Sequence, residues 1–374
     1  MTNIPFESYA FAATGGSTPR SMPMRLADVI NVKDYGALGN GINDDTSAIQ
    51  SALSAAYGTV AAPNGAANCT ANKLVIFPSG HYLISSPLLI PPVMGARIIG
   101  SGSSTTVIEN TTANGGVIKT DGFCYSHLEG LGLKSNGTGT CLWLGDTGRG
   151  LVPSVQSNSF VNMSYEGGDY GVQCGADGLM GSEFTFINNS WANHTQGGLV
   201  TANYNALQET VIGGRFVNCL HGIWCWGGSV PVIVGVSFAG AGIDDIRTEG
   251  GAFDGFYVAG CRSTSTNFLS ARGAVSFVLK GIEHLGLSNG YFVENLGCQV
   301  NIKNCHSSLG EVYTIYRADM KIQNSWFERT DWYQPQYANL WWDAQVEQEN
   351  LTIGTASALT QIKCRRDTRD YALA

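Results

Sequence analysis

Four acidic residues and one arginine lie close together in segment 242–255. Asp244, Asp245, Glu249 and Asp254 are only a few residues apart, and Arg247 stands among them. Enzymes that hydrolyse glycosidic bonds use two carboxylates about 5 to 9.5 Å apart, one as acid and one as nucleophile or base. Two like charges at such a distance also raise one of the two pKa values, as a general acid requires. We therefore predict that Asp244, Asp245 and Asp254 lead the list of catalytic residues, which also includes Glu249, Glu166, Asp169 and His194. A solvated loop between two strands is the alternative.

A repeated pattern of a large apolar residue, a gap and Asn or Gly surrounds this segment. It occurs at 160–162, 186–188, 216–218 and 238–240, with weaker copies at 302–304 and 322–324, so it recurs about every 20 to 30 residues. Periods of this size are typical of solenoids, whereas a propeller blade needs about 40 residues. Asn also suits turns in the left-handed backbone conformation. The repeat therefore predicts a solenoid of short strands.

Aligning the copies by their apolar residue predicts a column of polar side chains on one outer face, because equivalent residues of adjacent coils lie about 4.8 Å apart. The predicted column contains Glu166, Asp169, His194, Trp224, Asp244 and Asp245. Exposed aromatic rings stack on sugar rings, so the tryptophans beside this column are candidate substrate contacts. The predicted substrate-binding residues are Trp191, Trp224, Trp226, Arg247 and Tyr257.

A lyase is the alternative chemistry at the same place. It needs a base near the α-proton of a uronate, for which Tyr170, His194 or Tyr257 could serve, and cations or Ca²⁺ that neutralise the uronate carboxylate. The available cations are Arg215, Arg247, Arg262 and Arg272. Because they are sparse, we favour hydrolysis, which needs no cofactor. No histidines have zinc-binding spacing, so we expect no metal site.

Composition and charge exclude several classes of partner. The chain has 374 residues, of which 48 are glycine and only 13% are charged. Its net charge of −8, with no run of basic residues, argues against nucleic acid as a binding partner. No apolar run is long enough to span a membrane, and no signal peptide is visible at the N-terminus. Localisation therefore stays open between a virion, the cytosol and secretion after signal removal. We expect the ten scattered cysteines to be reduced and buried.

The N-terminal third combines a glycine turn, a helix start and short strands. Segment 31–53 reads NVKDYGALGNGINDDTSAIQSAL, in which Asp44, Asp45 or Thr46 can cap a helix with apolar residues at 49, 52, 53 and 56. Segment 75–82 reads VIFPSGHY, and segment 98–102 reads IIGSG. Together these segments resemble the N-terminal signature of the pectate-lyase-like superfamily.

This resemblance implies an all-β, right-handed parallel β-helix with a short N-terminal capping helix, often a homotrimer, that acts on polysaccharide. The superfamily contains tailspike depolymerases, hydrolases, lyases, epimerases and transferases, so it implies the fold and not the reaction. We expect an N-terminal arm at 1–30 and a β-helix domain with its C-terminal cap at 31–374. Our functional prediction is a polysaccharide-cleaving glycoside hydrolase. The alternatives are a lyase, a transferase similar to the β-helix fructotransferases, and a glycan-binding tail protein or adhesin without catalysis.

Overall fold

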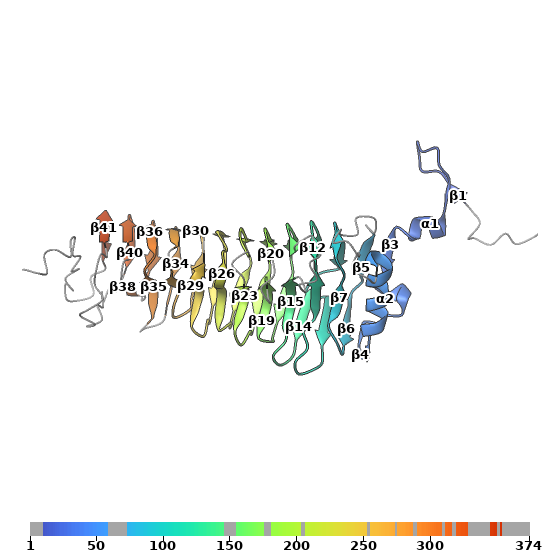
Figure 1. Cartoon of the computed structure of the whole chain (residues 1–374), viewed down its shortest axis with the longest axis horizontal. Coiled ribbons are helices and arrows are strands. Elements are labelled where there is room, and N and C mark those ends of the chain that lie inside the picture. The colour runs from blue at the N-terminus through green and yellow to red at the C-terminus, as the bar shows by residue number, and fades with distance from the viewer. Residues whose placement is uncertain are drawn as a thin grey trace, which may run out of the picture.

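The computed structural model describes most of the chain. The described residues are 10–58, 73–145, 155–175, 181–202, 206–252, 255–273, 275–286, 290–308, 311–315, 319–327, 345–349 and 352–353. They form an elongated stack of coils whose strands run across the long axis, with the helices at the N-terminal end (Figure 1). No described helix is long and apolar enough to cross a membrane.

Three long parallel sheets form the sides of the stack. Sheet 1 contains β3 (Val29–Asn31), β5 (Leu74–Phe77), β9 (Arg97–Gly100), β13 (His127–Glu129), β17 (Ser159–Val161), β21 (Thr185–Ile187), β24 (Thr210–Ile212), β27 (Val232–Val234), β30 (Gly255–Ala259), β33 (Ser276–Lys280), β36 (Gln299–Lys303), β39 (Asp319–Gln323) and β41 (Gln345–Glu349). Sheet 2 contains β4 (Asn40–Asp44), β6 (Gly80–Ile84), β10 (Thr106–Asn110), β14 (Gly132–Ser135), β18 (Ser164–Glu166), β22 (Ser190–Ala192), β25 (Arg215–Val217), β28 (Ser237–Ala239), β31 (Arg262–Ser263), β34 (Glu283–His284), β37 (His306–Ser307), β40 (Trp326–Phe327) and β42 (Thr352–Ile353).

Sheet 3 is shorter and carries the longest strands. It contains β7 (Leu88–Ile90), β11 (Ile118–Asp121), β15 (Thr140–Gly145), β19 (Tyr170–Cys174), β23 (Gly197–Ala202), β26 (His221–Gly228), β29 (Asp244–Ala252), β32 (Leu269–Arg272), β35 (Tyr291–Leu296) and β38 (Glu311–Ile315). Four two-residue strands make a small sheet: β8 (Val93–Met94), β12 (Phe123–Cys124), β16 (Val155–Gln156) and β20 (Gly181–Ser182). The predicted parallel β-helix is therefore confirmed.

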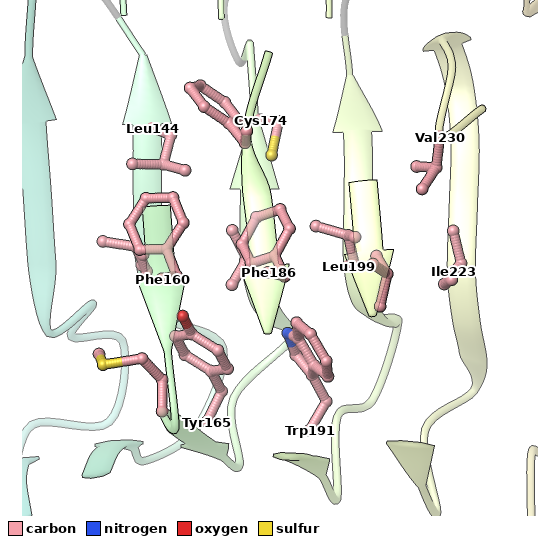
Figure 2. Packing of buried hydrophobic residues seen from close by; sticks show 14 of the residues in the cluster. Leu144, Phe160, Tyr165, Cys174, Phe186, Trp191, Leu199, Ile223 and Val230 are labelled. Carbon is pink, nitrogen blue, oxygen red and sulfur yellow. The ribbon is translucent and has the colours of Figure 1, made fainter. Parts of the chain in front are cut away.

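The interior is filled by side chains that stack from coil to coil (Figure 2). The rings of Phe160 and Phe186 stack at 5.0 Å between centroids, and those of Trp191 and Phe216 at 4.3 Å. In the three-residue strands of sheets 1 and 2 the middle side chain points inward, since successive side chains alternate between the two faces. Eight cysteines are free and buried, as predicted: Cys124, Cys141, Cys174, Cys219, Cys225, Cys261, Cys298 and Cys305.

The repeated Asn residues occupy left-handed turns, as predicted, but at two different corners of the coil. Asn162 and Asn188, with φ of 53° and 54°, follow strands of sheet 1. Asn218, with φ of 52°, follows β25 of sheet 2. The alignment of all copies by their apolar residue was therefore wrong. Phe160 and Phe186 belong to one sheet, whereas Phe216 and Phe238 belong to the next.

The N-terminal end is capped by α2 (Thr46–Tyr57), as predicted. Its residues Ile49, Ala52, Leu53 and Ala56 are buried, and the helix packs against β3, β5, β7 and the 3₁₀ helix η2 (Val32–Tyr35). The Asp45 carboxylate accepts hydrogen bonds from the backbone N–H groups of Leu38 (2.7 Å) and Gly39 (3.0 Å). It therefore fixes the glycine turn. The Asp44 carboxylate instead accepts from Thr46 N at the helix start (2.9 Å).

The residues before β3 form β1 (Ala10–Phe11), β2 (Arg20–Ser21) and α1 (Met22–Leu26). The two strands pair antiparallel, and α1 lies beyond the end of the stack (Figure 1). Arg20 and Asp28 form an ion pair at 2.8 Å that joins the two sides of this segment. An N-terminal arm ending near residue 30 remains a prediction.

Candidate functional site

The outer face of sheet 3 brings charged and aromatic side chains from four neighbouring strands together. The parallel register places Trp224 of β26 beside Arg247 of β29, and Arg247 beside Ser270 of β32. Ser270 is in turn paired with Glu294 of β35. Because alternate residues of a strand share a face, Trp226, Glu249 and Arg272 lie two residues further along the same face. We call this surface the sheet 3 cluster.

Asp244 is the buried centre of one half of the cluster. Its side chain is fully shielded from solvent and accepts a hydrogen bond from His221 Nδ1–H at 2.7 Å and one from the Tyr291 hydroxyl at 3.2 Å. Arg247 NH1 lies 3.8 Å from the same carboxylate. Burial, and then the negative charges of Asp244 and Glu294, raise the pKa of Tyr291 far above its ordinary value. Tyr291 therefore acts as a hydrogen-bond donor and not as a base.

The other half of the cluster contains two carboxylates that share one guanidinium group. Arg272 NH1 lies 3.9 Å from Glu249 Oε2, and Arg272 NH2 lies 3.7 Å from Glu294 Oε2. Glu249 also accepts a hydrogen bond from Arg247 Nε at 2.6 Å, and Glu294 accepts one from the Ser270 hydroxyl at 2.7 Å. The side chains of Glu249 and Glu294 are 30% and 21% exposed, so a bound molecule can reach both.

An aromatic group continues the cluster toward the N-terminal coils. The ring of Trp224 lies 4.5 Å from that of His221 and 4.7 Å from that of Trp226, between centroids. Tyr170 of β19 meets Trp226 edge to face at 6.3 Å. Trp226 is 38% exposed, which makes it the tryptophan of this group best placed to contact a ligand. Arg247 approaches the Trp224 ring at 6.0 Å and so connects the aromatic and charged parts.

Asp245 does not belong to the outer face, contrary to the prediction. Asp245 is buried, and its carboxylate accepts a hydrogen bond from Ser263 Oγ at 2.5 Å. Ser263 belongs to β31 of sheet 2, whereas the cluster lies on sheet 3. Burial raises the pKa of Asp245 to about 8, against the hydrogen bonds from Ser263 and Ser265 that lower it. A substrate on the outer face cannot reach this carboxyl.

Trp191 and His194 also lie inside the solenoid, contrary to the prediction. Trp191 is 0% exposed and stacks between Tyr165 and Phe216, so it cannot stack on a sugar (Figure 2). His194 is buried, and its Nδ1 lies 2.7 Å from the carbonyl oxygen of Gly167. Burial lowers the pKa of His194 to about 4, which keeps the ring neutral. Both residues serve the core.

The remaining predicted residues lie apart from the charged cluster. Glu166 is exposed on sheet 2, beside Lys134, and Tyr257 is 40% exposed on sheet 1. Asp169 directly precedes β19, and its carboxylate accepts a hydrogen bond from the Thr195 hydroxyl. It lies near Tyr170, at the aromatic end of the cluster. Asp254 lies outside the described residues. Of the predicted acids, Asp244 and Glu249 are thus the two that the structure places together.

Sequence reasoning missed the roles of His221, Tyr291 and Glu294, and it named Arg272 only as a cation available to a lyase. His221 follows the turn at Asn218 by three residues, and Asp244 follows the turn at Gly240 by four. Counting from these corners, rather than from the apolar residues, brings the two side chains to within one residue of the same position along the coil. For Tyr291 and Glu294, the comparable sequence signal is the Asn-Gly pair at 289–290, directly before β35.

Comparisons with known proteins agree with this architecture. Residues 29–138 match the family model described as rhamnogalacturonase A/epimerase, pectate lyase-like. A segment of 84 residues, 21% of this chain, is 40% identical to mannuronan C5-epimerase AlgE2 of Azotobacter vinelandii and covers 7% of that enzyme. The chain covers 15% or less of the curated relatives that it matches first.

Two solved structures share the fold over nearly the whole chain. ORF18 of Geobacillus virus E2 matches with a TM-score of 0.53 and 16% identity, over 92% of this chain and 66% of that chain. The Dettilon tailspike protein gp208 matches with a TM-score of 0.53 and 13% identity, over 89% and 62%. At such identities the likeness concerns the fold alone. The resemblance to the pectate-lyase-like superfamily is thus confirmed by the family match over residues 29–138 and by the parallel β-helix.

Proposed function

We propose that this chain is a polysaccharide-cleaving glycoside hydrolase whose substrate lies on the outer face of sheet 3. One observation carries the proposal. Two partly exposed carboxylates, Glu249 and Glu294, approach the same guanidinium of Arg272, next to an exposed tryptophan. Glycosidases need such a pair, one carboxyl to protonate the leaving oxygen and one to attack or to activate water.

The two carboxylates differ in their surroundings, which suggests their roles. Glu249 is bonded by Arg247 and approached by Arg272, so its negative charge is well compensated. We assign it as the nucleophile or base. Glu294 accepts a hydrogen bond from the Ser270 hydroxyl at 2.7 Å, and its single guanidinium contact, with Arg272, is longer at 3.7 Å. We assign it as the acid that protonates the leaving oxygen.

Asp244 positions Arg247 rather than contacting the substrate. It is held by His221 and Tyr291 and lies 3.8 Å from the Arg247 guanidinium, which in turn donates to Glu249. Asp244 therefore fixes the position of Arg247, and Arg247 in turn fixes the position of the Glu249 carboxylate. Removing Asp244 would leave His221 and Tyr291 without their shared acceptor.

The charge of the cluster favours a neutral sugar over a uronate. Asp244, Glu249 and Glu294 bring three negative charges, and Arg247 and Arg272 bring two positive ones. Both guanidinium groups already face carboxylates, so no surplus positive charge of the cluster is left to neutralise a uronate carboxylate, as β-elimination demands. The name of one similar protein, mannuronan C5-epimerase AlgE2, supports polysaccharide as the class of substrate. We also propose the homotrimer that the family resemblance implies.

The proposal is tested by incubating the full chain with a panel of neutral and acidic polysaccharides. We expect new reducing ends and oligosaccharides from at least one neutral polymer. A protein that binds glycan tightly but releases no product from any polymer would instead be a glycan-binding tail protein or adhesin. Products without new reducing ends would indicate a transferase.

Replacing Trp226 by Ala should weaken binding of the polysaccharide substrate about tenfold, because one exposed ring face is lost from the sugar contact. The binding constant is measured by affinity electrophoresis or calorimetry. Trp326→Ala is the matched control, since Trp326 is 42% exposed on sheet 2, away from the cluster. Equal losses in the two variants would contradict a specific role of Trp226.

A further inference from the structure

Three polar side chains on the outer face of sheet 1 form a hydrogen-bonded series that the proposed glycosidase chemistry does not use. Ser159 Oγ lies 2.7 Å from His127 Nδ1, and Glu129 Oε2 lies 3.2 Å from His127 Nε2. The imidazole ring of His127 therefore lies between a hydroxyl and a carboxylate, with one partner at each ring nitrogen. We call these three residues the sheet 1 triad.

The register of two neighbouring strands brings the triad together. His127 and Glu129 are the first and third residues of β13, so they share its outer face, whereas Leu128 between them is buried. Ser159 is the first residue of β17 and the parallel partner of His127. Both strands lie inside sheet 1, with β9 on one side and β21 on the other. The three side chains are thus positioned by regular strands, which hold a site more precisely than loops do.

The hydrogen bonds of the triad have one consistent direction when the ring of His127 is neutral. A carboxylate only accepts, so His127 Nε2–H donates to Glu129. His127 Nδ1 then accepts a hydrogen bond from the Ser159 hydroxyl. A hydroxyl bonded to a base, with that base oriented by a carboxylate, is the arrangement that activates serine as a nucleophile. Either ring nitrogen can take up the proton of the hydroxyl.

The triad can be reached from solvent. The side chains of His127 and Glu129 are 25% and 40% exposed, and Ser159 is half-buried. Thr185 of β21 is the register partner of Ser159 on the side away from His127. Because adjacent strands lie about 4.8 Å apart, the Thr185 hydroxyl is placed to donate to an oxyanion that forms at Ser159.

The surroundings of Ser159 suit a short acyl group without charge. Val161 follows Ser159 on the same outer face of β17, and Ile187 follows Thr185 in the same way on β21. Both side chains are apolar and half-buried, so they form a flat apolar border beside the serine. Such a border can contact a few carbon atoms and offers no charge to bind an acidic group.

We propose that the sheet 1 triad is a second catalytic site, which hydrolyses carboxylic esters of short uncharged acyl groups. Ser159 Oγ attacks the carbonyl carbon, and its proton passes to His127 Nδ1. The bond between the carbonyl carbon and the alcohol oxygen then breaks, and the alcohol leaves with that proton. The result is an acyl group bound to Ser159.

Water completes the reaction. A water molecule attacks the acyl carbon and gives a proton to His127 Nδ1, and the bond from that carbon to Ser159 Oγ breaks. The proton returns to Ser159, and the carboxylic acid is released. One ester and one water thus yield one alcohol and one acid, with no other reactant. Glu129 contacts no reacting atom and is a positioning residue for His127.

The first test is hydrolysis of p-nitrophenyl acetate by the full chain, followed by the release of p-nitrophenol. The unaltered chain should exceed the rate in buffer, and a fluorophosphonate probe should form an adduct on Ser159 that mass spectrometry locates. Ser159→Ala should lose both. Ser190→Ala is the matched control, since Ser190 is also a half-buried first residue of a strand, and its hydroxyl accepts from Arg215 Nε at 3.0 Å on sheet 2. This control should keep both the turnover and the adduct.

The second test separates the base from its positioning residue. His127→Gln should lower kcat for the ester at least about 100-fold. His81→Gln is its control, because His81 Nε2 lies 2.8 Å from Glu109 on sheet 2, and this variant should leave kcat unchanged. Glu129→Gln should lower kcat at least about tenfold with little change in KM, and Glu129→Asp should recover part of the loss.

Three results would each overturn the proposal: no turnover and no adduct with the unaltered chain, full activity of Ser159→Ala, or full activity of His127→Gln. An unchanged kcat of Glu129→Gln would overturn the role of Glu129. Circular dichroism of every variant should match the unaltered chain. No glycosidic bond takes part in these measurements, so their outcome is independent of the proposed glycoside hydrolase activity.

Discussion

Glu249→Gln and Glu294→Gln should each lower kcat for polysaccharide cleavage at least about 100-fold, since each removes an acid or base that takes part in bond breaking. Glutamine keeps the size of the side chain and can still contact Arg272, so the fold and the binding of substrate should change little. Initial rates over a range of substrate concentrations separate kcat from KM. If Glu294 is the acid, activated substrates with good leaving groups should lose less activity in Glu294→Gln than the natural polymer does.

Glu283→Gln is the control for these variants. Glu283 lies 3.2 Å from Arg262 on sheet 2, so it is also a partly exposed carboxylate paired with an arginine, but away from the cluster. Its replacement should leave kcat within about twofold of the unaltered enzyme. Near-normal kcat in both cluster variants would show that the reaction does not use this pair.

Asp245→Asn should flatten the pH dependence of stability. The folded chain raises the pKa of Asp245 from its ordinary value of 3.8 to about 8, chiefly by burial. Between these two values the unfolded chain has lost a proton that the folded chain retains. The free energy of unfolding therefore falls as pH rises from about 4 to about 8, by up to about 1.4 kcal/mol per pH unit, and no further above that. Asparagine has no proton to lose, so the variant lacks this fall.

The measurement is urea unfolding of both proteins between pH 4 and pH 9. The stability of Asp245→Asn relative to the unaltered chain should increase steadily up to about pH 8 and then level off. Glu209, a second buried carboxyl whose pKa burial raises, remains in both proteins, so a weaker fall with pH persists in the variant. Asp34→Asn, at an exposed position, should follow the unaltered chain. A constant difference at every pH would contradict a buried, protonated Asp245.

The fold could be predicted from the sequence because its local signals agree with one another. Left-handed turns favour Gly and Asn, and the Asn residues at 162, 188 and 218 occupy such turns. The apolar spacing of Ile49, Ala52 and Leu53 specifies a helix with one buried face, which closes the end of the core. Such signals depend on neighbouring residues only.

The site could be predicted only in part because the sequence pattern did not distinguish side chains that point into the core from those on the outer face. Three residues predicted on the outer face, Trp191, His194 and Asp245, are buried. Trp191 is the middle residue of a three-residue strand, like Phe160, and that position points inward. His194 lies at the corner between β22 and β23, and Asp245 is the second residue of β29, next to such a corner, where the alternation of side chains does not hold. Both corners of a coil favour the same pattern of apolar residue and Asn, so the pattern alone cannot tell which sheet a strand joins.

The partners of Asp244 were beyond sequence reasoning for a further reason. His221 is 23 residues away and Tyr291 is 47 residues away. Their meeting depends on the number of residues in each intervening coil, and this number varies. Tyr291 approaches Asp244 across β32, which contributes a small residue, Ser270, to the same face. Only the alignment of the strands in the folded sheet shows that the small side chain on β32 leaves room for Tyr291 to contact Asp244.

Cleavage in water enriched in ¹⁸O tests the central claim most directly. The full chain is incubated with the polymer that it degrades, and the products are analysed by mass spectrometry and ultraviolet absorbance. Hydrolysis by Glu249 and Glu294 predicts one ¹⁸O atom per bond cleaved, at the new reducing end, and no ultraviolet absorbance of an unsaturated sugar. Products without ¹⁸O that absorb in the ultraviolet would show β-elimination and would contradict the carboxylate-pair mechanism.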